Sequence, residues 1–460
     1  MRENDNPQMP LAPPWGKHER SRELETISEV LDQHPNLNVL AAADLCGARK
    51  SRRGRKGMTG EQVLRVGLLY MIFELTYEEL AFHLEDSAAF RTFSRLPFDK
   101  AVKVSTLKKN VKRIGPETWE AVNLALVMTA EARGFEKGRM TRTDCTVVET
   151  NIHHPTDSTL LWDCVRVVTR ILHKLAERFP DEPWKFHDRT RRAKRRAFEI
   201  EFPSKKKGTK KSEQREVLYR KLITITEEVY DYGLDALAKL KQVVPSGIIE
   251  VMFLGSAESE LRGFLASTQM VLDQTRRRII GGERVPVEDK IVSIFETHTD
   301  IIIKKNREVL FGHKVCLTGG RSSMILDAVI EDGNPADSTL VERSIERLTA
   351  IYERPPRQAS FDGGFASKDN LQFAKDAGVE DVMFHKKCGL EVEDMTKSKW
   401  VFRKLRRFRA GIEGCISTLK RAFGMKRASW RGERGFKSYV WASIASFNAV
   451  ILARHVLAAS

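Results

Sequence analysis

The chain has 460 residues, 41% of them hydrophobic, with a formal net charge of +16 and a pI near 9.5. This composition excludes a chain that is disordered throughout, and it allows two or three domains with a sizeable core. The excess of positive charge favours a polyanionic partner, which for a protein of this size is more often nucleic acid than a membrane surface.

Targeting signals and cysteine patterns point to a cytoplasmic protein without membrane contact, and a DNA partner would make it nucleoid-associated. We find no apolar run of about 18 residues of the kind a membrane helix needs, and the first stretch, MRENDNPQMPLAPPW, lacks the apolar core of a signal peptide. The six cysteines are scattered without a C-x-x-C pair, which indicates neither a disulfide framework nor a zinc knuckle. We expect them to be small buried residues in a reducing compartment.

The first 58 residues are predicted to form a flexible basic arm. Residues 1 to about 20 are polar and rich in proline, and the stretch GARKSRRGRKG at 47–57 combines cations with glycines. Such a run contacts phosphates or nothing at all. We assign its contacts to DNA and name Arg52, Arg53 and Arg55 as DNA-binding residues.

Residues 59–135 are predicted to form a helical N-terminal DNA-binding domain. Thr59 is placed to cap a first helix, in which Val63, Val66 and Leu69 recur at helical spacing. Further helices are expected to start near Thr76 and Ser105, with turns short enough for a helix-turn-helix. A helical packing module without DNA contact is an equally weighted alternative.

The stretch RMTRTDCTVVE at 139–149 favours a first strand because it is rich in Thr and Val. Side chains alternate along a strand, so Asp144, Thr146 and Val148 share one face while Glu149 points to the other. A basic helical insertion is predicted to follow at 158–284. Its apolar residues at alternating four and three spacing favour a helical hairpin with a buried stripe, with a dimer contact as the alternative: Leu218, Leu222, Ile225, Val229 and Tyr232.

The strand pattern returns after residue 285. Four stretches read as strands of an antiparallel meander, and helices and strands then alternate up to a basic C-terminal helical region. Together with residues 136–157, residues 285–460 therefore predict an α/β domain with a mixed sheet. The four stretches are IVSIFE at 291–296, DIIIKK at 300–305, LFGHKVCLTG at 310–319 and SSMILDAVIED at 322–332.

Three acids stand where such a sheet can bring them together: Asp144, Asp362 and Glu413. Asp362 and Glu413 also have simpler explanations, because Asp362 precedes two glycines and can form a turn, while Glu413 can relieve repulsion in a basic helix. Together, three carboxylates are ligands suited to Mg²⁺ or Mn²⁺, and two such ions about 4 Å apart activate an attacking oxygen at a phosphodiester. We predict two ions at this site.

The spacing around Glu413 adds DNA contacts to this site. Arg409 lies four residues before Glu413 and Lys420 seven after it, so all three side chains share one helical face. Such a face suits a phosphate backbone that runs across a two-metal site.

These motifs resemble bacterial insertion-sequence transposases of the DDE type, with the ISNCY group as the nearest likeness. The resemblance is carried by TDCTVVETNIHHPTDSTLLWD around Asp144, FGHKV at 311–315, SFDGGFAS around Asp362 and the R-x3-E-x6-K pattern at Glu413. It implies an RNase H-like catalytic domain at 136–157 and 285–460, with Asp144, Asp362 and Glu413 as catalytic metal ligands. The family signature has a tyrosine three residues before the arginine, and here that position is Arg406, which we count with Arg409 and Lys420 as DNA-binding.

The resemblance implies a transposase that binds the terminal inverted repeats of its own insertion sequence, cleaves DNA with Mg²⁺ or Mn²⁺ and transfers the strand. Its partners would be double-stranded DNA, as transposon ends and target, and a second copy of the chain in a homodimer on DNA. A catalytically inactive DNA-binding regulator is the alternative, and an RNase H-type nuclease acting on RNA–DNA hybrids is a third hypothesis. For His153 and His154 we expect a loop role near the active site rather than a zinc site.

Overall fold

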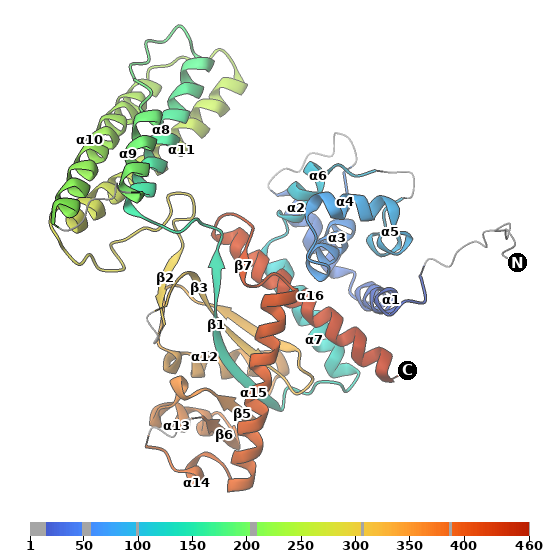
Figure 1. Ribbon diagram of the computed structural model, residues 1–460. Helices are drawn as coiled ribbons and strands as arrows, with labels where there is room; N and C mark the ends of the chain where they lie inside the picture. Colours follow the sequence, from blue (N-terminus) through green and yellow to red (C-terminus); the bar gives the residue numbers. More distant parts are fainter. Residues whose placement is uncertain are drawn as a thin grey trace, which may run out of the picture. The chain divides into compact units, whose positions relative to one another are not determined.

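The computed structural model describes residues 15–47, 57–97, 101–202, 209–304, 308–385 and 389–459. The chain has two compact units: Met1–Asn151 with Lys304–Ser460, called the sheet unit below, and Ile152–Ile303, called the helical unit. Figure 1 shows both units, with most of their helices and strands labelled.

The sheet unit is built around β1 (Met140–Thr150), the long first strand that the sequence predicts. The strand order is β2-β3-β1-β5-β6, with β4 paired to β3 and β7 paired to β1. Because β1 runs antiparallel to β3 and parallel to β5, the predicted mixed sheet is confirmed, and it is consistent with an RNase H-like fold. The other strands of the sheet unit are β3 (Val309–Gly319), β4 (Ile325–Ile330), β5 (Gln358–Phe361), β6 (Asp381–Phe384) and β7 (Arg427–Ala428), and the edge strand β2 (Asp300–Ile303) is formed by the last residues of the helical unit.

Helices cover both faces of this sheet. On one face, α12 (Val341–Tyr352) and α13 (Lys368–Asp376) bury a cluster that includes Phe384 of β6. On the other, α15 (Lys399–Ala422) lies across β1, β5 and β6, where Met383 packs against it. The adjacent residues Met383 and Phe384 of β6 thus pack on opposite faces of the sheet, as the two-residue repeat of a strand requires. The short helix α14 is Val392–Met395.

The stretch 291–296, which we predicted as a strand, forms no strand in the structure. Ile291 and Ile294 are buried in the core of the helical unit, and the Ser293 hydroxyl accepts hydrogen bonds from the backbone N–H groups of Phe295 and Glu296. This side-chain turn competes with ladder pairing, which explains why apolar, β-branched residues do not extend the sheet here.

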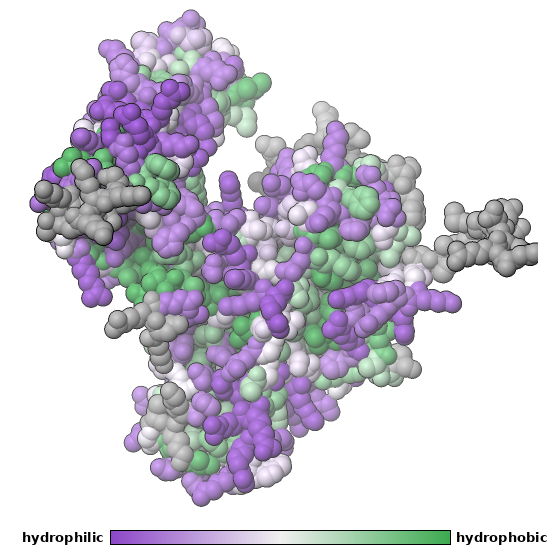
Figure 2. Space-filling model, in the orientation of Figure 1, coloured by the Kyte–Doolittle hydropathy of each residue, from purple (hydrophilic) through white to green (hydrophobic). Residues whose placement is uncertain are grey.

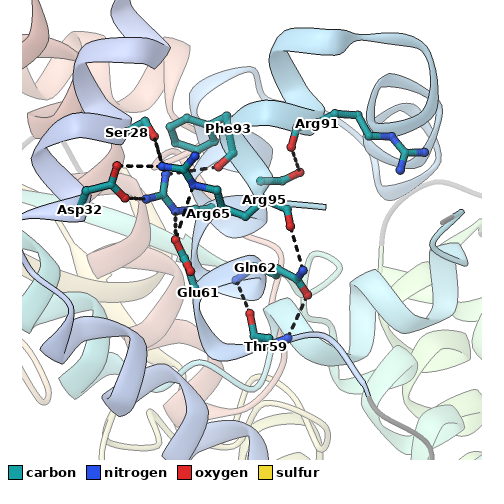
Figure 3. Close-up of polar contacts among 10 residues, drawn as sticks. Ser28, Asp32, Thr59, Glu61, Gln62, Arg65, Arg91, Phe93 and Arg95 are labelled. Carbon is teal, nitrogen blue, oxygen red and sulfur yellow. Dashed lines mark hydrogen bonds and ion pairs between the residues drawn. The ribbon is translucent and has the colours of Figure 1, made fainter. Parts of the chain in front are cut away.

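Two helices occupy part of the segment that we predicted as a flexible arm, so that prediction is wrong for α1 (Glu19–Asp32) and α2 (Asn36–Cys46). The apolar residues of α1 face the core, and its polar residues Ser28 and Asp32 bind the buried guanidinium of Arg65. Arg65 also donates to Glu61 and to the backbone carbonyl of Phe93 (Figure 3). One buried cation therefore ties three helices together. Residues 48–56, with the predicted DNA contacts Arg52, Arg53 and Arg55, lie outside the described residues.

The helices predicted between 59 and 135 form, but they do not make a separate domain. The predicted starts at Thr59 and Thr76 are confirmed as capping boxes, with Gln62 and Glu79 as their partners. Their core is continuous with that of the sheet and of the last helix, so an independent N-terminal helical domain is not confirmed. The helices are α3 (Gly60–Ile72), α4 (Tyr77–Asp86), α5 (Ala88–Ser94), α6 (Val104–Val111) and α7 (Pro116–Ala132).

The last helix, α16 (Glu433–Ala459), is the main element that our sequence analysis missed. It packs against α1, α3 and α7, and Figure 1 shows it crossing α7. By length and composition it is apolar enough to cross a membrane, which corrects our statement that no such segment exists. Since 61% of its apolar window is buried inside the protein, it is a core helix here.

The helical unit is a bundle with its own hydrophobic core. Leu222, Ile225 and Val229 of the predicted stripe are fully buried against the neighbouring helices of the same chain, so the buried-stripe interpretation is confirmed for them. Its helices are α8 (Asp157–Arg178), α9 (Thr190–Glu201), α10 (Thr209–Leu240) and α11 (Ile248–Thr275), followed by a π-helical turn at Arg276–Ile280.

Candidate active site

The three predicted acids come from three elements that meet on one side of the sheet. Asp144 lies within β1, and Asp362 directly follows β5. Because Thr143 and Phe361 are paired in the parallel ladder of these strands, the residues after them, Asp144 and Asp362, are neighbours. Glu413 lies on α15, which packs across both strands.

A single guanidinium, that of Arg409, contacts all three carboxylates. Its Nη1 lies 3.5 Å from Asp144 Oδ2 and 3.5 Å from Asp362 Oδ1, and its Nη2 lies 3.1 Å from Glu413 Oε1. The Arg409 side chain is only 11% exposed, whereas that of Glu413 is 61% exposed. Glu413 and Asp362 are thus open to solvent above a buried cation, whereas the Asp144 side chain is only 21% exposed.

The environment of Asp144 disfavours its negative charge. Burial raises the pKa of Asp144 to about 6, and the charges of Asp362 and Glu413 add to this increase. A hydrogen bond of 2.8 Å from the backbone N–H of Cys145 and the positive charge of Arg409 act in the opposite direction. Arg409 therefore compensates only part of the negative charge gathered here, as expected where carboxylates share one site.

Arg142 and Phe408, which we did not predict as site residues, hold α15 against β1. The Arg142 side chain, two residues before Asp144 on the same strand face, donates to the backbone carbonyl of Phe408 at 3.1 Å and stacks over the Phe408 ring. A Cβ added at Gly411 would lie 1.7 Å from Arg142 Nη1, so only glycine leaves room for this contact. An arginine at an even spacing from Asp144 was the available sequence signal, but the spacing alone did not identify its partner.

The predicted DNA-binding cations occupy different surroundings. Arg406 is exposed on the outer side of α15, together with Arg403 and Arg407, and Figure 2 shows hydrophilic residues gathered over this part of the molecule. Lys420 is half-buried, and its pKa is lowered by burial and then by the charge of Lys304. Arg409 turns inward to the acids. Their DNA-binding roles stay predictions.

Whether the acids fit a metal ion depends on Arg409. Among the described residues, no group of three or more His, Cys, Asp or Glu side chains is arranged to hold a metal ion. The donor set nevertheless fits Mg²⁺ or Mn²⁺, because three carboxylates with hard oxygen donors converge on one positive charge and leave an excess of negative charge. The predicted ligands are therefore gathered around a guanidinium, and the two ions stay a prediction.

The two histidines after β1 are both exposed and belong to the helical unit. His153 Nε2 lies 3.5 Å from Asp163 Oδ2, at the start of the bundle. Their expected role near the active site stays a prediction.

Comparison with known proteins gives one result. Residues 293–449 match the family model described as "Transposase DDE domain", whereas no curated protein and no solved structure matches the chain. The matched segment contains Asp362, Arg409 and Glu413, and Asp144 lies upstream of it. The narrower ISNCY-like grouping stays a prediction. A match that includes two of the three converging acids supports a transposase of the DDE type.

Proposed function

We propose that this protein is an active DDE transposase that binds the terminal inverted repeats of its own insertion sequence, cleaves DNA there and joins the freed end to target DNA. The observation that carries this proposal is the convergence of Asp144, Asp362 and Glu413 on one site, from elements far apart in sequence. Carboxylates gathered at one site supply the hard oxygen ligands that divalent cations such as Mg²⁺ bind.

In this proposal Asp144, Asp362 and Glu413 hold two Mg²⁺ or Mn²⁺ ions. When bound, these ions would lower the pKa of an attacking water and stabilise the charge that develops on the phosphate. The rigid parallel pair of β1 and β5 fixes two of the ligands, and the contact between Arg142 and Phe408 fixes the helix that carries the third. Preorganised ligands on regular elements keep the geometry needed for attack.

The two chemical steps have the same form. In cleavage, the oxygen of a water molecule forms a bond to the scissile phosphorus while the bond to the 3′ oxygen breaks, which leaves a 3′-OH. In strand transfer that 3′-OH attacks a phosphodiester of target DNA, and a 3′ oxygen of the target leaves. No covalent enzyme intermediate is needed, so one carboxylate site serves both steps.

In this proposal the phosphates of the DNA are bound by exposed cations of α15. Arg403, Arg406 and Arg407 are all exposed on the helix that carries Glu413. Phosphate contacts orient a duplex without reading its sequence. We propose that these residues place the scissile strand across the acids, in a cytoplasmic enzyme that forms a homodimer when it holds two DNA ends together.

The test is cleavage of a supercoiled plasmid that carries the gene with its natural flanks, in Mg²⁺ and in Mn²⁺, by the wild type and by Glu413→Gln. We expect the wild type to cut at the element's ends and Glu413→Gln to bind the flanks without cutting. Glu342→Gln, which alters an exposed acid in the first turn of α12, is the control and should cut like the wild type.

Two outcomes would overturn the proposal. If the wild type binds the flanks but neither it nor the control cuts, the protein is a DNA-binding regulator and Glu413 relieves repulsion among basic neighbours. If a substrate panel shows cleavage of RNA–DNA hybrids and not of the element's ends, the protein is an RNase H-type nuclease.

A further inference from the structure

Arg409 differs from Arg347, another arginine that binds acids, in the length and number of its contacts. It differs from Arg277, which also contacts three acids, in that the Nε of Arg277 donates to Glu283. Arg347, for comparison, holds Asp327 with two short contacts of 2.6 and 2.7 Å. The three contacts of Arg409 are 3.1, 3.5 and 3.5 Å long and go to three different carboxylates. Charge-assisted pairs with good geometry are usually about 2.7 to 2.9 Å long. Arg409 is therefore shared among the acids and bound tightly by none.

The remaining hydrogen-bond donor of Arg409, its Nε, is not used in a contact with the acids. The Nε of Arg409 is buried and, within the described part of the chain, has no hydrogen-bond partner. A buried donor without a partner costs free energy, so this position of the guanidinium is stabilised by the charge of the acids rather than by a full set of hydrogen bonds. A group held in this way leaves easily when another cation neutralises the acids.

A divalent cation and the guanidinium cannot occupy this position together. Mg²⁺ binds carboxylate oxygens at about 2.0 to 2.1 Å, which requires the oxygens to converge on the ion. Here the oxygens are spread around Arg409, and the absence of a preformed group of metal ligands among the described residues agrees with this arrangement. The ion and the arginine also repel each other.

We propose that Arg409 is a displaceable internal counter-ion of the active site. Without a divalent cation it neutralises part of the charge of Asp144, Asp362 and Glu413; when a cation binds, it leaves the acids and contacts a DNA phosphate beside Arg406. This inference rests on the proposed function, since it requires the acids to bind metal. Its consequence is reciprocal: metal favours DNA binding through Arg409, and DNA favours metal binding.

The test measures metal binding directly, by calorimetric titration of Mn²⁺ into the protein without DNA. We expect Arg409→Gln to bind Mn²⁺ about tenfold more tightly than the wild type, because the competing cation is gone. Arg406→Gln is the matched control: it removes the same charge from the same helix, at an exposed position, and should change Mn²⁺ affinity far less. Equal or weaker Mn²⁺ binding by Arg409→Gln would overturn the proposal.

A second measurement follows the guanidinium to the DNA. The affinity for a short duplex is compared in EDTA and in Ca²⁺, at constant ionic strength. We expect Ca²⁺ to strengthen binding by the wild type and to have a smaller effect on Arg409→Gln. An equal effect of Ca²⁺ on both proteins would contradict the second half of the proposal. If Arg409→Gln does not fold, Arg409→Met replaces it, since methionine also removes the charge and is a comparable helix former.

Failure of this inference and failure of the proposed function give different results. If Glu413→Gln binds Mn²⁺ as the wild type does, the acids are not a metal site, and both the proposed function and the counter-ion inference are wrong. If Mn²⁺ binding depends on Glu413 but not on Arg409, only the counter-ion inference is wrong.

Discussion

When no divalent cation is bound, the negative charge of Asp144 lowers the stability of the folded protein. Its pKa of about 6 in the folded protein lies above the value of about 4 for an unfolded aspartate. A raised pKa contributes stability that is fully present below about pH 4 and is lost as the pH rises through 6. In EDTA at pH 7.5 we therefore expect Asp144→Asn to stabilise the protein by about 1 to 3 kcal/mol, a gain that shrinks towards zero near pH 4.

Urea unfolding at both pH values measures this effect. Asp231→Asn, which changes an exposed aspartate on α10, is the control for the chemical substitution itself. A variant that is less stable than the wild type at pH 7.5 would mean that the hydrogen bond from Cys145 and the contact with Arg409 outweigh burial and repulsion.

At the scale of the element, substitutions at two glycines of α15 distinguish the effect of packing on stability from the effect of helix propensity. At Gly411 an added Cβ meets Arg142, whereas at Gly414 nothing lies within 4 Å. We expect Gly411→Ala to destabilise the protein by about 1 to 3 kcal/mol, because the buried arginine has to move. Gly414→Ala should stabilise it by about 0.5 to 1 kcal/mol, because alanine favours a helix.

The two variants together form the experiment, with the free energy of unfolding in urea as the readout. Since Arg142 anchors the helix that carries Glu413, Gly411→Ala is also expected to reduce cleavage more than it reduces DNA binding. Equal changes of stability at the two positions would show that Arg142 does not depend on the missing Cβ.

The sequence predicts elements whose pattern is local. The strand around Asp144 and the helix starts at Thr59 and Thr76 are confirmed, because alternation and capping involve residues that are near in sequence. The strand predicted at 291–296 is wrong, because a serine turn and burial against helices decide its conformation. Such tertiary contacts are not visible in a pattern of residue types.

The same limit applies to the site. Spacing places Arg409 and Glu413 on one helical face, which the structure bears out with a contact of 3.1 Å. Spacing does not reveal what the face packs on, so the sequence predicts a DNA contact for Arg409 and not its contacts with Asp144 and Asp362. The contact between Arg142 and Phe408 joins positions more than 260 residues apart, a separation for which the sequence offers no pattern.

At the scale of the whole molecule, the net charge of +16 implies DNA binding that depends steeply on salt. Each phosphate neutralised by a lysine or arginine releases a condensed counter-ion, which contributes about −0.9 to the slope of log K against log salt concentration. For six or more contacts, affinity is expected to fall by on the order of 10³ between 50 and 200 mM salt. Affinity that is flat over this range would exclude the basic surfaces as the DNA contact.

A pair of double variants distinguishes local phosphate contacts from net charge. Arg403→Gln with Arg406→Gln removes two exposed cations of α15, and we expect it to make the salt slope shallower by about 2. Arg354→Gln with Arg357→Gln lowers the net charge equally but removes cations that pair with Glu131 and Glu380. Since paired surface arginines are already neutralised, the slope of this control should stay that of the wild type. If both double variants lose the same slope, DNA responds to the total charge of the molecule, and α15 has no special place in binding it.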